Sequence, residues 1–252
     1  MEIESYQAPK PKFSAWQQFK FIALRIVFPP VLLWDLLKTG ANKLLGAFVG
    51  RFVLPAQYMF TDDESNYSLW NDDTSCPVKY KIITHDGAHL DTLEFQHPSQ
   101  NNTEPHYQKY IINFVGNSMR YEDILYDMKQ DAKTLNANVV GFNFRGVGQS
   151  KVYATSKDDL VTDGIAQVQR LLDKGVSPQN ITLKGLSLGA GIASLVAHHF
   201  HQTGQPVNLF NDRSFSSITD FVVGIIRLER DEYGDAPGHK DSQKGIILGW
   251  LA

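Results

Sequence analysis

Short apolar runs alternate with helix-like stretches along the chain from residue 76 onward, and only a few folds accommodate that order. The expected strands at residues 78–84 and 90–96 flank a His-Asp-Gly turn at 85–87 and form a hairpin. Residues 110–115 and 138–144 are apolar runs typical of buried strands, and further strands are expected at 181–184 and 206–210. In residues 121–135, 160–172 and 190–201, apolar side chains recur instead at steps of three and four, as on one face of a helix. This alternation predicts an α/β fold, with a mostly parallel sheet and helices on both of its faces.

The composition of the chain excludes several classes of function. The chain has 252 residues, which suffice for one sizeable domain and an appendage. Its single cysteine, Cys76, excludes a disulfide scaffold and a C-x-x-C metal or redox site. The formal net charge of −3 argues against general nucleic-acid binding, which needs an excess of basic residues. Because no nucleotide-binding glycine motif and no H-E-x-x-H motif occurs, we expect neither a metal nor an organic cofactor.

The N-terminal segment, residues 1–60, differs from the rest in being both apolar and basic, and we expect it to form short helices. Within residues 19–37 the longest uncharged run covers residues 26–34 and contains two prolines, whereas a membrane-spanning helix needs about 20 mostly apolar residues. Three interpretations remain open: a cap packed on the domain, an anchor through residues 19–60 on an anionic membrane surface, and a re-entrant hairpin. The expected location is therefore cytoplasmic or at the membrane periphery.

Residues 61–75 carry five carboxylates and no basic residue, which indicates a solvated linker. We therefore place a domain boundary there, and expect residues 76–252 to form the α/β domain.

The candidate catalytic motif is G-x-S-x-G at residues 185–189 (GLSLG), between an expected strand and an expected helix. Glycines two residues before and after the serine let the strand and helix approach each other at a strained turn. That turn exposes the Ser187 hydroxyl, and the N-terminus of the following helix offers N–H groups to developing negative charge. Ser187 is the predicted nucleophile.

Residues 78–218 resemble the α/β-hydrolase superfamily. Residues 144–150 (FRGVGQS) are similar to its R-G-x-G-x-S loop after the fourth strand, and residues 176–189 to its nucleophile strand and turn. More narrowly, residues 113–118 (NFVGNS) and 211–217 (NDRSFSS) resemble chlamydial CHLPS-type and Legionella SidB-type hydrolase-like proteins of intracellular bacteria. The narrower resemblance implies a protein exported into host cells.

The resemblance also implies an oxyanion hole formed by the backbone N–H groups of Asn117 and Leu188. Val115 stands where the superfamily usually has the histidine of H-G-x, but backbone donors do not depend on that side chain. Asn143 stands where many relatives have an acidic residue, and we expect a structural role for it.

The base and the acid of a Ser-Asp-His triad are harder to find. His198, His199 and His201 follow Ser187 on the same expected helix, about 16–21 Å away at 1.5 Å per residue, which is too far for a hydrogen bond. His239 is the remaining base candidate, and Asp212, at the end of an expected strand, is the acid candidate. The alternative for Asp212 is that it braces the strand end together with its neighbour.

The chain ends without the last two strands of the superfamily, so we expect a C-terminally truncated fold or a fragment of a longer protein. Two functional hypotheses follow. The first is a serine hydrolase of carboxylic esters or thioesters, with a lipid or acyl-ester substrate favoured by the apolar N-terminus. The second is a hydrolase-fold module without competent catalysis that binds a membrane or a protein.

Overall fold

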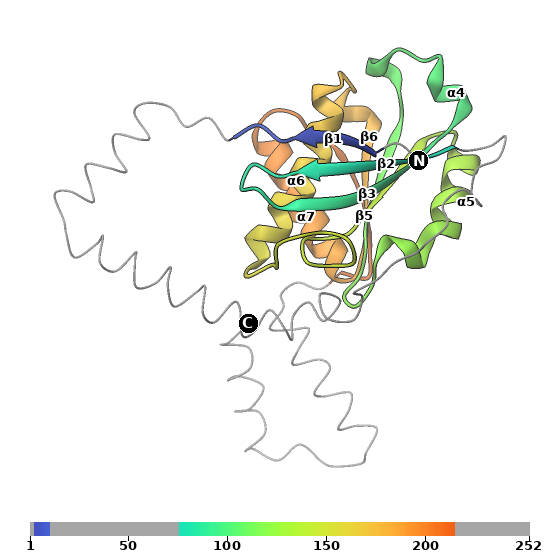
Figure 1. Ribbon diagram of the computed structural model, residues 1–252. Helices are drawn as coiled ribbons and strands as arrows, with labels where there is room; N and C mark the ends of the chain where they lie inside the picture. Colours follow the sequence, from blue (N-terminus) through green and yellow to red (C-terminus); the bar gives the residue numbers. More distant parts are fainter. Residues whose placement is uncertain (1–2, 11–75, 215–252) are drawn as a thin grey trace, which may run out of the picture.

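The computed structural model describes residues 3–10 and 76–214, which form a twisted seven-stranded sheet with helices on both faces (Figure 1). The strands are β1 (Ile3–Gln7), β2 (Cys76–Ile83), β3 (His89–Gln96), β4 (Tyr110–Phe114), β5 (Asn138–Phe142), β6 (Ile181–Leu186) and β7 (Asn208–Asp212). Their spatial order is β1-β2-β3-β5-β4-β6-β7. Only the pairs β2–β3 and β3–β5 are antiparallel, which confirms the predicted mostly parallel α/β fold.

The main helices are α5 (Leu125–Leu135), α6 (Lys157–Asp173) and α7 (Leu188–Gln202), with a short α4 (Pro98–Asn101) and three 3₁₀ turns, Pro105–Tyr107, Tyr121–Ile124 and Pro178–Asn180. Helices α6 and α7 pack against each other on one face of the sheet, and α5 lies on the other face (Figure 1). Helix α6 begins at a capping box, in which Ser156 accepts from the Asp159 N–H and the Asp159 carboxylate accepts from the Ser156 N–H.

Strand β1 corrects the expectation that residues 1–60 form only short helices. Residues 3–7 instead pair in parallel with β2, from Ile3 opposite Lys79 to Gln7 opposite Ile83. Five residues of alternating character can join an existing sheet edge because β2 already presents an ordered row of backbone groups. The other expected features of the N-terminal segment, including membrane contact through residues 19–60 and the linker at 61–75, lie outside the described residues.

Strand β7 forms the opposite edge of the described sheet. Its side chains are mostly exposed, with Leu209 at 41% and Phe210 at 58% of their accessible surface. In the described part of the chain, β7 therefore leaves a partly apolar sheet edge exposed. The predicted truncation concerns residues 215–252, which lie outside that part. None of the helices in the two described ranges is long and apolar enough to cross a membrane.

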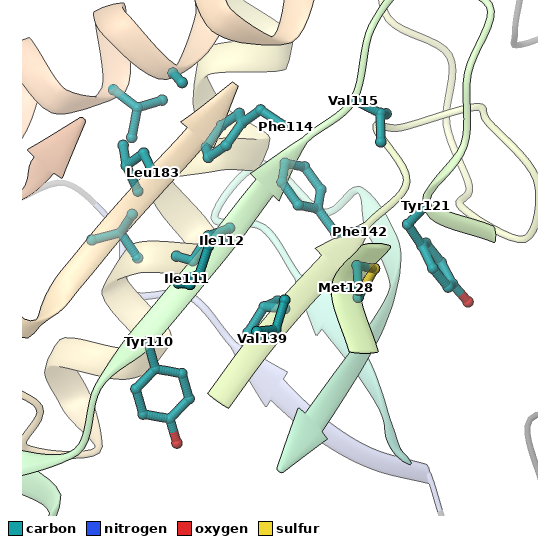
Figure 2. Packing of buried hydrophobic residues seen from close by; sticks show 14 of the residues in the cluster. Tyr110, Ile111, Ile112, Phe114, Val115, Tyr121, Met128, Val139, Phe142 and Leu183 are labelled. Atoms are coloured by element: carbon teal, nitrogen blue, oxygen red, sulfur yellow. The ribbon is translucent and has the colours of Figure 1, made fainter. Parts of the chain in front are cut away.

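The core is built on the two central strands. All five residues of β4 and all five of β5 are buried, as expected for strands covered on both faces (Figure 2). The rings of Phe114 and Phe142 meet edge to face with centroids 5.2 Å apart, and Phe144 lies 5.1 Å from Phe142. This cluster fixes the end of β4, and thereby the loop that follows it.

Gly164 allows α6 and α7 to approach the sheet closely. A Cβ at this position would lie 2.6 Å from Phe114 Cε1 and 2.8 Å from Val196 Cγ2, closer than real Cβ contacts. Gly191, which is also inside a helix, has open space where its Cβ would be.

We predict opposite effects of alanine at these two helical glycines. Gly164→Ala should lower the free energy of unfolding by about 1–3 kcal/mol through overpacking. Gly191→Ala should raise it by about 0.5–1 kcal/mol, because alanine favours the helix and meets no neighbour. Urea denaturation of both variants checks this, and equal effects at the two positions would contradict the close packing at Gly164.

Candidate active site

Ser187 lies at the tight turn between β6 and α7, as its motif predicts. Its backbone has φ 51° and ψ −116°, a left-handed conformation that a residue with a Cβ adopts only under strain. The side chain is half-buried, and its hydroxyl has no hydrogen-bond partner among the described residues. The serine is thus held by the backbone alone and is available to another group.

The two motif glycines are required by contacts with the neighbouring backbone. A Cβ on Gly185 would lie 2.4 Å from Ala190 Cα, and one on Gly189 would lie 2.1 Å from the carbonyl oxygen of Phe114. Any larger residue would therefore push α7 away from β6 or from the end of β4. This agrees with the role assigned to these glycines from the sequence.

Backbone hydrogen bonds hold the turn on both sides. The Ser187 N–H donates to the Asp212 carbonyl oxygen at 3.0 Å, which ties the turn to the end of β7. The Ser187 carbonyl oxygen accepts from the N–H groups of Ala190 and Gly191 at 3.1 and 3.2 Å, and so begins α7. The strained residue is therefore bonded to the sheet before it and to the helix after it.

The loop after β4 brings Gly116 beside the serine. A Cβ on Gly116 would lie 3.8 Å from Ser187 Cβ. Val115, which replaces the histidine of the superfamily's H-G-x motif, is buried in the core. Neither the Asn117 N–H nor the Leu188 N–H, the first of α7, donates a hydrogen bond to any described residue. The predicted oxyanion donors thus come from segments that flank Ser187, and both donors are unused.

Asp212 is joined to the turn through its backbone, whereas its carboxylate bonds elsewhere. Arg213 Nε and Nη2 donate to the two carboxylate oxygens at 3.2 Å each, and both side chains are substantially exposed. This contact matches the alternative in which Asp212 and its neighbour brace the strand end. No described residue bonds to the Ser187 hydroxyl, and the base candidate His239 lies outside the described ranges.

The histidines of α7 are at its far end, as expected from their spacing. His198, His199 and His201 are exposed, and the last two belong to the final turn of the helix. Although His199 is exposed as a residue, partial burial of its ring lowers its pKa and favours the neutral form. His85 and His89 are four residues apart, but they flank the β2–β3 turn, and no described group of three or more His, Cys, Asp or Glu side chains could hold a metal ion.

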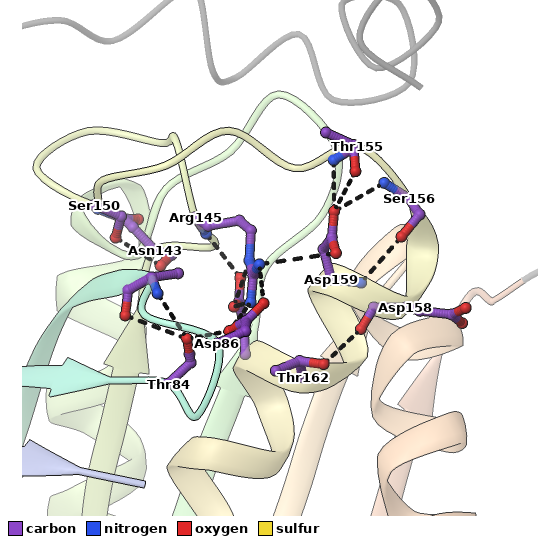
Figure 3. Close-up of polar contacts among 12 residues, drawn as sticks. Thr84, Asp86, Asn143, Arg145, Ser150, Thr155, Ser156, Asp158, Asp159 and Thr162 are labelled. Carbon is purple, nitrogen blue, oxygen red and sulfur yellow. Dashed lines mark hydrogen bonds and ion pairs between the residues drawn. The ribbon is translucent and has the colours of Figure 1, made fainter. Parts of the chain in front are cut away.

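A buried ionic cluster, which the sequence did not predict, lies under the loop after β5. Arg145 is 3% exposed, and its Nη2 lies 2.7 Å from Oδ1 of Asp163, which is completely buried. Its Nη1 donates to Asp86 at 2.7 Å, and its backbone N–H donates to Asp163 at 2.8 Å (Figure 3). Arg145 therefore links the β2–β3 turn, the loop after β5 and α6.

The charges in this cluster affect one another. Burial by itself would raise the pKa of Asp86, but hydrogen bonds from Arg145 and Thr84 outweigh it and hold that pKa below its ordinary value. The sequence signals that could have revealed the cluster are the arginine of R-G-x-G-x-S and the aspartate of the preceding His-Asp-Gly turn.

Asn143 and Ser150 close the same loop, which confirms the structural role expected for Asn143. The Asn143 side chain accepts from the Tyr121 N–H at 3.0 Å and donates to Glu122. Ser150 Oγ donates to the Asn143 carbonyl oxygen at 2.8 Å and accepts from the Asp91 N–H at 2.8 Å. These bonds connect β3, the loop after β5 and the start of the α5 region.

Comparison with solved structures identifies the class of fold. An alpha-beta hydrolase from Vibrio vulnificus superposes with a TM-score of 0.56 at 21% identity, covering 73% of this chain and 66% of that one. An esterase from Pyrococcus furiosus superposes with a TM-score of 0.50 at 18% identity, covering 68% of this chain and 61% of that one. The chain therefore has the α/β-hydrolase fold, as its motifs predict, and spans somewhat less than two thirds of each neighbour.

Residues 14–223 match the family described as Chlamydia CHLPS protein (DUF818), and the chain belongs to that family. Half of the chain, 128 residues, is 29% identical to a segment of the multifunctional-autoprocessing repeats-in-toxin of Vibrio cholerae serotype O1. A segment of 117 residues is 28% identical to the toxin of the same name from Vibrio vulnificus. The matches span 3% and 2% of the lengths of these toxins, so the similarity concerns a small segment of each.

We predict that Arg145→Met destabilises the protein through the charge it leaves on buried Asp163. The free energy of unfolding at neutral pH should fall by about 3–5 kcal/mol, and Asp163→Leu in the same chain should restore much of it. The loss should shrink as the pH falls, because an unpaired buried Asp163 has a raised pKa and binds a proton in the folded state.

Urea denaturation at several pH values measures these changes. Lys151→Met, an exposed position in the same loop, serves as the control and should change the free energy of unfolding by less than about 0.5 kcal/mol. A loss at Arg145 as small as that of the control would show that the ionic cluster does not stabilise the loop.

Proposed function

We propose that this chain is a serine hydrolase of carboxylic esters or thioesters, with Ser187 as the nucleophile. The observation that carries the proposal is the strained turn, in which an unpartnered serine hydroxyl lies between two segments with unused N–H groups. Strain of this kind is maintained only where the surrounding structure enforces it, and it is typical of functional sites. The α/β-hydrolase fold and the esterase among its structural neighbours support the same reaction class.

In the proposed reaction, Ser187 Oγ forms a bond to the substrate carbonyl carbon while a base takes its proton. The carbonyl oxygen gains the electron pair of the broken π bond, and the N–H groups of Asn117 and Leu188 stabilise its negative charge. The bond to the alcohol or thiol then breaks, the leaving group takes the proton, and water releases the acyl group by the same steps.

The base in this scheme comes from outside the described residues, and His239 is the candidate in the chain. Asp212 would orient it only if its carboxylate left Arg213, a bond that is exposed and therefore weak. A lipid or acyl-ester substrate and contact of residues 19–60 with an anionic membrane surface are further parts of the proposal. So is export into a host cell as an effector, which similarity to segments of two Vibrio toxins supports.

The second candidate is a hydrolase-fold module that binds a partner without catalysis. It is favoured by the bond between Asp212 and Arg213, which occupies the carboxylate of the predicted acid. The two candidates differ in the reactivity of Ser187.

We predict that a fluorophosphonate probe labels the full chain at Ser187. Ser187→Ala should abolish labelling and lower kcat/KM for p-nitrophenyl butyrate at least about a thousandfold, because the nucleophile is lost. Ser194→Ala, on the same helix, should keep both activities. If the folded wild-type chain is not labelled, the hydrolase proposal is wrong and the binding module becomes the function.

We predict further that His239→Ala slows labelling by about a hundredfold to ten-thousandfold, the usual contribution of a general base. Asp212→Asn should have a smaller effect in the same direction. His201→Ala, at the far end of α7, is the control and should label at the wild-type rate. Unchanged labelling of the His239 variant would assign the base to another residue.

A further inference from the structure

The loop after β4 folds a methionine back toward the proposed nucleophile. The Met119 N–H donates to the Gly116 carbonyl oxygen at 3.3 Å, which closes a tight turn over residues 116–119. A Cβ on Gly116 would lie 3.1 Å from Met119 Sδ and 3.8 Å from Ser187 Cβ. Because both distances start from the same point, the methionine sulfur and the serine Cβ can be no further apart than their sum, about 6.9 Å. Met119 is therefore a neighbour of Ser187 to which the proposed reaction gives no role.

Backbone strain accompanies this turn. Ser118, its third residue, has φ 59°, in the left-handed region that favours glycine. The side chain of Asn117 supports that conformation, since its Oδ1 accepts from the Ser118 N–H at 3.0 Å. Strained residues persist only where the surrounding structure enforces them, and they are typical of functional sites. The turn thus holds Met119 at a fixed place next to the serine.

The Met119 side chain is apolar and only partly buried. It packs against the main core cluster, but it is not sealed inside that cluster. A methionine side chain is unbranched and polarisable, so it adapts its shape to apolar groups placed against it. A substrate bound at Ser187 therefore meets an apolar surface on the side of the loop after β4.

The order of the strands separates the two parts of a substrate at Ser187. Strand β6, which leads to the serine, has β4 on one side and β7 on the other. Met119 follows β4, whereas Asp212, the acid candidate, is the last residue of β7. In the proposed reaction the leaving oxygen or sulfur takes its proton from the base that the acid orients, so it faces the β7 side. The acyl chain is then directed to the β4 side, toward Met119.

We infer that Met119 contacts the acyl chain of the substrate and limits its length. The inference rests on the proposed function and adds the substrate class, which is esters or thioesters of short, unbranched aliphatic acids. A thioether close to the reacting carbon gives favourable apolar contact to an acyl chain that ends there. The same thioether obstructs a longer chain.

The test is the kcat/KM of the full chain for p-nitrophenyl acetate, butyrate and octanoate, which share one leaving group. The wild type should prefer butyrate to octanoate. Met119→Ala should raise the ratio of kcat/KM for octanoate to that for butyrate at least about tenfold, because it opens space for the longer chain. Met119→Leu, which nearly conserves the side-chain volume, should keep the wild-type ratio.

Ile124→Ala is the matched control, because Ile124 is also partly buried against the main core cluster. It should leave the ratio unchanged, and circular dichroism verifies the folding of each variant. Ethyl and octyl butyrate, which share one acyl group, test the leaving-group side, and Met119→Ala should change their relative kcat/KM less than about twofold.

Fluorophosphonate labelling distinguishes the two ways in which the inference can be wrong. If the folded wild type is not labelled at Ser187, the proposed function is wrong, and so is this inference. If the wild type is labelled and hydrolyses the esters, an unchanged octanoate-to-butyrate ratio in Met119→Ala overturns the inference alone. So does an equal change in Ile124→Ala, or a preference that changes with the alcohol instead of the acyl chain.

Discussion

The close approach of α7 to the ends of β4 and β6 is the constraint on which the site depends. Gly189 faces the Phe114 carbonyl oxygen at a distance that leaves no room for a side chain, and Gly185 faces Ala190 in the same way. Because both contacts are with main-chain atoms, they cannot be relieved by a change of rotamer. The turn between them must be sharp, and this forces Ser187 into its left-handed conformation while two backbone N–H groups remain beside it.

The packing that supports this approach comes from two regions. The phenylalanine cluster of β4 and β5 fixes the end of β4, and Gly164 lets α6 settle against Phe114 and Val196. On the other side, Arg145 joins the β2–β3 turn to α6 through Asp86 and Asp163. A buried ion pair of this kind adds little net stability, but removing one partner is costly, so it holds the loop in one arrangement.

Much of the fold could be predicted because the central strands of the hydrolase-like region are short apolar runs with distinct ends. All residues of β4 and β5, which lie within the apolar runs 110–115 and 138–144, are buried. The capping box at Ser156 marks the start of α6 directly in the sequence. The motif at Ser187 was predictable for the same reason, since its glycines and its strand–helix context are local. Strand β1 was not, because five residues of weak pattern become a strand only through partners 76 residues away in the sequence. The Arg145 cluster was missed because its members are separated by up to 77 positions and only the fold brings them together.

The amino-acid sequence by itself determined the order of strands and helices, the position of the nucleophile turn and the glycines that the turn requires. These are properties of neighbouring residues, set by hydrophobic period and by backbone sterics. Only the tertiary structure decided that Gly116 lies beside Ser187, and that the Asp212 backbone anchors the turn while its carboxylate bonds to Arg213. Such contacts depend on the register of strands and the packing of helices, and these are fixed only when the whole sheet is assembled.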